Sequence, residues 1–126
     1  MEIVHTRVEQ LWLDDEGILH VVVKPGAEIH LDDAKETVAQ LDRLAGGKRR
    51  PVLVDMTHLR SMDRDARLHV AGPATAKVEI AAALLVGSPL AKAVGNFFMG
   101  INKPLIPTRL FTSQEDAIAW LREYRC

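Results

Sequence analysis

Residues 52–67 read VLVDMTHLRSMDRDAR. The stretch begins with a short apolar run ending at Asp55, continues through a polar link and closes with a charged segment typical of a helix start. Open α/β proteins usually place their binding residues where a buried strand ends and a helix follows. The stretch therefore indicates an α/β fold, and it raises the question whether the link is a regulatory switch or only a turn.

Strands are predicted on both sides of this stretch. Apolar and polar residues roughly alternate from Ile3 to Leu13, DDEG supplies a turn, and ILHVVVK follows, which predicts an opening β-hairpin. The continuous apolar runs PVLVDM (51–56) and AAALLVG (81–87) are typical of strands buried on both faces. TRLFT, at 108–112, predicts one more short strand.

Four helices are predicted between and after these strands. Residues 31–47 give the most regular pattern, with acids in the first turn, two glycines at the end and one apolar face formed by Leu31, Ala34, Val38, Leu41 and Leu44. Residues 63–79 predict a helix interrupted near Gly72 and Pro73, because proline removes a backbone donor. Residues 90–102 and 113–124 predict the last two, the final one capped by Ser113.

The resulting order, ββαβαβαβα, favours a mixed, mainly parallel sheet with helices packed against it.

The 126 residues, 48% of them hydrophobic, suit one domain spanning 1–126. A net charge of −1 gives no broad electrostatic reason to bind nucleic acid. The single cysteine, Cys126, excludes an intramolecular disulfide and fits a reducing, cytoplasmic setting. The apolar run at 80–86 is far shorter than the roughly 20 residues that span a bilayer, so we expect no membrane-spanning segment.

Catalytic and metal-binding motifs are not evident, and we expect no cofactor or metal. The five histidines (His5, His20, His30, His58 and His69) have no paired-ligand spacing. The sequence contains neither a GxSxG elbow nor a complete phosphate-binding loop at LAGGKRR. An acid–base site built from Asp55 and His58 is the enzymatic alternative, although turn and capping roles explain aspartates such as Asp55 and Asp63 more simply. A non-enzymatic protein is therefore expected.

The order of elements, together with VLVDMTHLRSMD before the second helix, resembles the STAS domain, the SpoIIAA-like fold of anti-anti-sigma factors, and the related SEC14-like lipid-binding proteins. The resemblance covers the chain nearly end to end. It is closest to a bacterial group of uncharacterised STAS/SEC14-like proteins that share a run like ALLVGSPLAKAVGNFFMGINKPLIPTRLFTSQEDAIAWL, found here at 83–121.

The resemblance also bears on the switch. Anti-anti-sigma factors carry a phosphorylatable serine directly after an aspartate at the start of the second helix. Here Asp63 matches the aspartate, but Arg64 stands in the place of the serine. Phosphorylation requires a hydroxyl, which arginine lacks. The nearby hydroxyls of Ser61 and Thr57 are explained by turn and capping roles more readily than by modification.

Two functions follow as hypotheses. The first is a protein-interaction or regulatory module with a docking face formed by Asp63, Arg64, Arg67, Lys92, Asn96 and Met99. The second, favoured by the SEC14-like resemblance, is a carrier or sensor of a small apolar or lipid-like ligand, with a pocket near Phe97, Phe98, Met99, Ile101, Lys103 and Arg109. Self-association as a homodimer is also expected, through the edge of the opening hairpin or the helix that carries Gly95 and Gly100.

Overall fold

The computed structural model describes residues 1–87, 89, 92–93, 96 and 105–124. Its main sheet has the strand order β1-β2-β3-β5-β7-β8. These strands are β1 (Val4–His5), β2 (Glu9–Leu13), β3 (Leu19–Val23), β5 (Arg50–Asp55), β7 (Glu79–Leu85) and β8 (Thr108–Phe111). The first three pair antiparallel and the others parallel, which confirms both the opening hairpin and the mixed, mainly parallel sheet.

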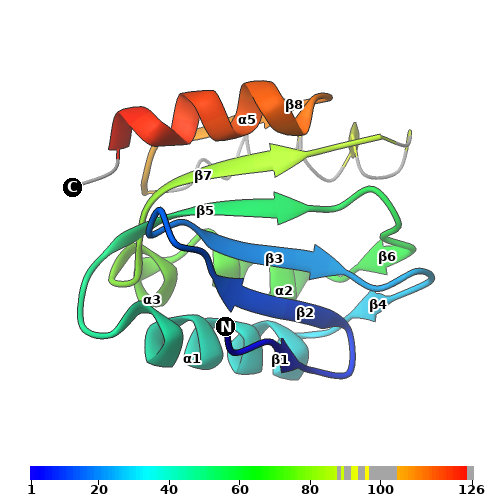
Figure 1. The fold of residues 1–126 in the computed structure, drawn as a ribbon. Helices are drawn as coiled ribbons and strands as arrows, with labels where there is room; N and C mark the ends of the chain where they lie inside the picture. The colour runs from blue at the N-terminus through cyan, green and yellow to red at the C-terminus, as the bar shows by residue number, and fades with distance from the viewer. Residues whose placement is uncertain (88, 90–91, 94–95, 97–104, 125–126) are drawn as a thin grey trace.

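The described helices are α1 (Leu31–Ala45), α2 (Arg64–Val70), α3 (Pro73–Ala76) and α5 (Gln114–Leu121), with a 3-10 turn, η1 (Arg122–Tyr124), after the last. Two short strands that the sequence did not predict, β4 (Glu28–Ile29) and β6 (Ser61–Met62), form a separate parallel pair at the start of α1 and α2 (Figure 1). No helix in the described part of the chain combines the length and the apolar character needed to cross a bilayer.

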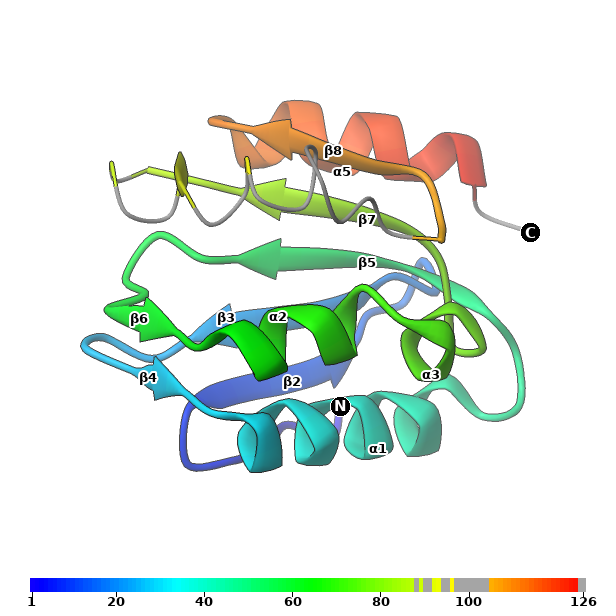
Figure 2. The same ribbon diagram turned by 180° about the vertical axis from the view of Figure 1, so that it is seen from behind.

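The helices cover the sheet on both faces, as Figures 1 and 2 show from opposite sides. Because side chains alternate along a strand, β5 and β7 each contribute to two cores. Leu53 and Ala83 pack with Leu121 of α5 on one face, whereas Val52 and Ala82 pack with Leu41 of α1 on the other. The helices α1, α2 and α3 therefore share one face of the sheet, and α5 covers the opposite face.

Several predicted helix boundaries are confirmed. Gly46 ends α1 with a left-handed φ of 67°, a conformation that glycine adopts without a Cβ penalty. The predicted helix over 63–79 is divided between α2 and α3 at Gly72 and Pro73. Most of the predicted helix over 90–102 lies outside the described residues, although Lys92 and Asn96 are helical.

Two predicted limits were wrong. The stretch 3–13, predicted as one arm of the hairpin, consists of two strands, β1 and β2, that pair antiparallel with each other. The second error concerns the site described below. The prediction continued the interrupted helix to residue 79, whereas Glu79 begins β7 and pairs with Arg50. The amide of Val78 donates a hydrogen bond to the carbonyl of Thr75, at 2.9 Å, and this turn ends the helical segment. A carboxyl side chain expected on a helix is consequently placed at the start of a buried strand.

Candidate functional site

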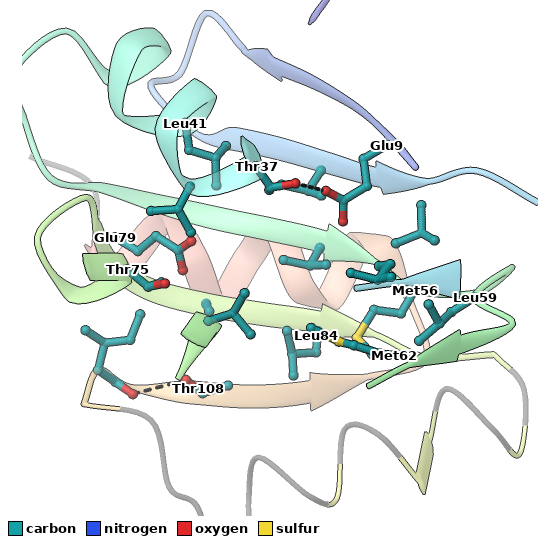
Figure 3. A pocket seen from close by; sticks show the side chains of 18 residues that line it. Glu9, Thr37, Leu41, Met56, Leu59, Met62, Thr75, Glu79, Leu84 and Thr108 are labelled. Atoms are coloured by element: carbon teal, nitrogen blue, oxygen red, sulfur yellow. Dashed lines mark hydrogen bonds between the residues drawn. The ribbon is translucent and has the colours of Figure 1, made fainter. Parts of the chain in front are cut away.

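A partly open cavity of about 100 Å³ lies between the sheet and the helices α1, α2 and α3. Side chains from all three helices and from strands of the main sheet line it, and most of them are apolar (Figure 3). Val21, Leu41, Val54, Met56 and Leu84 form much of this wall. Protein interiors are usually packed without voids of this size, so the cavity is a candidate binding site.

At one end of the cavity the carboxyl of Glu9 is buried, with 5% of the residue exposed. Glu9 lies on the same face of β2 as the fully buried Leu11, two residues further on, so the alternation of the strand turns it inward. The hydroxyl of Thr37, on α1, donates a hydrogen bond to Oε1 of Glu9. Burial raises the pKa of Glu9 to about 7, although the hydrogen bond from Thr37 acts to lower it.

Glu79 contributes the second carboxyl, and 7% of this residue is exposed. No other described residue donates a hydrogen bond to its side chain, although the guanidinium of Arg49 bonds its backbone carbonyl at 3.1 Å. The hydroxyl of Thr75, which also lines the cavity, is buried and has no hydrogen-bond partner in the described part of the chain. Burial, with a smaller contribution from repulsion by Glu9, raises the pKa of Glu79 to about 8.

The two carboxyls face the cavity from opposite ends. Glu9 pairs with Val23, at the carboxyl end of β3, whereas Glu79 pairs with Arg50, at the amino end of the parallel strand β5. In Figure 3 the Glu79–Thr75 pair and the Glu9–Thr37 pair accordingly lie at different places along the cavity. Among the described lining residues there is no lysine, arginine or histidine. The cavity thus combines apolar walls with two acidic side chains, and none of its described lining residues is a basic partner for these acids.

The arrangement offers a ligand two buried carboxyls and an apolar wall. The two acids lie at opposite ends of the cavity, and the described lining includes no histidine or cysteine. No cluster of three or more His, Cys, Asp or Glu side chains suited to a metal ion occurs among the residues that the structure describes. What the site offers a ligand is an apolar surface with hydrogen-bonding groups at its ends.

The polar link in 52–67 forms a turn and a helix cap. The carboxyl of Asp55 accepts a hydrogen bond from the amide of Thr57, at 3.0 Å. The carboxyl of Asp63 caps α2 by accepting a bond from the amide of Ala66, at 2.9 Å, and lies 3.1 Å from Nδ1 of His30. These contacts are the turn and capping roles expected for the two aspartates. Asp55 and His58 share no hydrogen bond or ion pair, so the geometry adds nothing to the acid–base alternative.

The docking-face residues predicted from the sequence are only partly described. Asp63 and Arg64 are exposed at the start of α2, whereas Arg67 is partly buried. Lys92 and Asn96 are exposed, and Met99 lies outside the described residues. The structure therefore describes an exposed, charged start to α2.

Of the six residues predicted to form a ligand pocket, the structure describes only Arg109. Phe97, Phe98, Met99, Ile101 and Lys103 lie outside the described residues. Arg109 is exposed on β8, with its guanidinium carbon 5.1 Å from the centroid of the Phe111 ring. Arg109 does not line the cavity, whereas the neighbouring Thr108 does.

Sequence reasoning missed four of the polar residues that line the cavity: Glu9, Thr37, Thr75 and Glu79. Three of them gave a weak signal. Glu9 occupies an inward position of an alternating strand, and Thr37 lies beside Val38 on the apolar face of α1. Glu79 directly precedes the apolar run at 80–86. A polar residue at a position that the pattern predicts to be buried and apolar could have indicated the site.

Comparison with known proteins identifies the fold and the family. A structure of an uncharacterised protein from Shewanella loihica PV-4, of the DUF3478 family and with a SpoIIAA-like fold, matches 95% of this chain and 90% of its own, with 21% identity and a TM-score of 0.53. This chain accordingly has a SpoIIAA-like fold, as the resemblance to STAS domains implied. Residues 11–125 match the model of the family described as "Domain of unknown function (DUF7793)", and the chain belongs to that family.

One further structure is similar in sequence. It is a protein with unknown function from Arthrobacter sp. FB24, 37% identical over 94% of this chain and 95% of its own, with a TM-score of 0.37. No curated protein matches the chain. The relatives described here therefore carry no assigned activity, and a function has to be argued from the site itself.

Proposed function

We propose that this protein is a non-catalytic binding module that holds a small, mainly apolar molecule in the cavity between the sheet and α1, α2 and α3. The observation that carries the proposal is an apolar cavity into which a buried carboxyl, Glu79, and a buried hydroxyl, Thr75, project without a hydrogen bond from the described residues. Buried polar groups are destabilising unless they are hydrogen-bonded. A ligand that fills the cavity and bonds these groups removes that cost.

The size of the cavity restricts the ligand. Pockets for drug-sized molecules commonly have volumes of about 300 to 1,000 Å³. At about 100 Å³ this cavity suits a molecule of only a few carbon atoms, which is smaller than an intact lipid. The carrier or sensor hypothesis is thereby narrowed to a small amphipathic compound.

A native mass spectrum of the gently purified protein tests the proposal, together with solvent extraction of the same sample. We expect a stoichiometric added mass that extraction removes, or, if purification strips the ligand, binding of short-chain organic compounds in a calorimetric titration. Ala82→Leu extends a side chain into the cavity and should abolish this binding. Ala119→Leu, at an exposed position of α5, is the matched control and should leave it unchanged.

Bare protein masses together with no binding of short-chain amines, alcohols or carboxylates would contradict the proposal. Equal loss of binding in Ala82→Leu and Ala119→Leu would also count against the cavity as the site. Folding of both variants is verified by circular dichroism, because overpacking in a core costs roughly 1–3 kcal/mol.

Protein interaction through the start of α2 is the second candidate function. It is favoured by the exposure of Arg64, whose side chain makes no hydrogen bond or ion pair with any described residue. Arg64→Glu should abolish capture of a specific partner, whereas Arg60→Glu, at another exposed arginine, should preserve it. Capture that is the same for both variants and the wild type would contradict an interaction through Arg64.

A further inference from the structure

The two ends of the cavity differ in how well their polar groups are satisfied. Glu9 accepts a hydrogen bond from Thr37, but the carboxyl of Glu79 and the hydroxyl of Thr75 receive none from the described residues. Both Glu79 and Thr75 are more than nine-tenths buried, with 7% and 5% of their surfaces exposed. At the Glu79 end a polar group of a ligand can therefore form hydrogen bonds that the described residues do not supply.

The charge of the cavity indicates which polar group fits. Its described lining contains two carboxyls and no basic side chain. A buried carboxylate is strongly disfavoured unless a cation or several hydrogen-bond donors accompany it. The raised pKa of Glu79, about 8, reflects that lack of compensation. A ligand that brings a positive charge and several N–H donors supplies what the protein side chains do not.

We propose that the ligand is a small primary aliphatic amine whose ammonium group binds between the carboxylate of Glu79 and the hydroxyl of Thr75. An ammonium has three donors, so it can bond both oxygen acceptors and keep one donor for water or backbone. The hydrocarbon part would then extend between Val54 and Leu84 toward Glu9. This inference rests on the proposed function, because it names the ligand class of the same cavity.

Three probes of matched length test the inference by calorimetric titration of the full chain: pentylamine, 1-pentanol and pentanoate. We expect pentylamine to bind at least about tenfold more tightly than 1-pentanol, since a hydrogen bond to a charged group is worth more than a neutral one. Pentanoate should bind most weakly, because its carboxylate meets two further acids.

A variant locates the contact. Glu79→Gln keeps the shape of the side chain but removes its negative charge, and it should weaken pentylamine binding about 10- to 100-fold while changing the binding of 1-pentanol little. Glu36→Gln, at an exposed position of α1, is the matched control and should leave both affinities unchanged. The comparison of the three probes in the wild type needs no variant, so it decides the matter even if Glu79→Gln does not fold.

The outcomes separate the two proposals. Binding of 1-pentanol or pentanoate at least as tight as that of pentylamine would overturn the amine assignment while leaving the cavity as a binding site. Pentylamine binding that is unchanged in Glu79→Gln would also overturn it. Binding of none of the three probes would overturn the amine assignment and contradict the proposed function as well.

Discussion

The carboxyls of Glu9 and Glu79 face one cavity from opposite ends, and only that of Glu9 accepts a hydrogen bond from a described side chain, the hydroxyl of Thr37. This asymmetry distinguishes two acids that are otherwise similar in burial. Because of this asymmetry, the polar groups at the Glu79 end have fewer hydrogen bonds from described residues than those at the Glu9 end. The two acids should therefore differ in their effects on stability and on binding.

Stability should fall as the pH rises. The ordinary pKa of a glutamate is 4.5, whereas burial raises that of Glu9 to about 7 and that of Glu79 to about 8. Between pH 4.5 and pH 8 the folded protein therefore binds more protons than the unfolded chain. The stabilisation of the fold that is present below pH 4.5 is lost as the pH rises toward 8. Each unit of pKa difference corresponds to about 1.4 kcal/mol, so the two raised pKa values together correspond to a decline of up to about 8 kcal/mol.

Urea unfolding at pH 5.5 and pH 8.5 measures this decline. Glu79→Gln cannot ionise and should be more stable than the wild type at pH 8.5, with a flatter profile. Glu36→Gln, at the exposed control position, should keep the wild-type slope. The groups that act on the two buried carboxyls are Thr37 and Asp33 on Glu9, and Glu9 on Glu79. A Glu79→Gln profile as steep as that of the wild type would contradict the burial of an ionisable Glu79.

Thr37 and Thr75, two of the threonines that line the cavity, should respond differently to the same substitution. Thr37→Val removes the donor to Glu9 and leaves a buried acceptor unsatisfied, so it should destabilise the fold by about 1–3 kcal/mol. Thr75→Val removes a buried hydroxyl that has no partner among the described residues, so it should be neutral or stabilising by up to about 1 kcal/mol. Thermal unfolding measures both, and equal destabilisation would show that Thr75 is hydrogen-bonded.

A methyl group should not fit at Gly87 without adjustment. A Cβ at this position would lie 3.0 Å from Cγ2 of Thr57, in the turn after β5. Gly87→Ala should therefore destabilise the protein by about 1–3 kcal/mol, as overpacking does. Thr57→Ser removes that Cγ2 and should relieve most of the effect in the double variant. Additive effects of the two substitutions in urea unfolding would contradict the contact.

The cap of α5 should contribute measurably to stability. The hydroxyl of Ser113 accepts a hydrogen bond from the amide of Asp116, at 3.3 Å. Ser113→Ala removes this acceptor and should cost about 1 kcal/mol, whereas Ser113→Asp retains an acceptor and suits the positive end of the helix. The difference is measured by urea unfolding at neutral pH. Equal stability of the two variants would show that the cap is not formed in solution.

The sequence by itself determined the order of the main elements. The alternation over residues 3–13, the continuous apolar runs at 51–56 and 81–87 and the cap at Ser113 are local signals, and strands or helices occur at each of them. The pair Gly72–Pro73 likewise predicted the break between α2 and α3, because proline cannot donate the backbone bond that continues a helix.

Only the tertiary structure decided where the binding groups lie. Glu9, Thr37 and the Thr75–Glu79 segment come from three separate parts of the chain. They line one cavity because the register of β2, β3, β5 and β7 and the packing of α1 and α3 place them on one face of the sheet. A local pattern reports whether a position faces inward, but whether inward-facing groups meet and leave a cavity depends on contacts between distant segments. The sequence therefore predicted the fold, and long-range packing decided the cavity on which the proposed function rests.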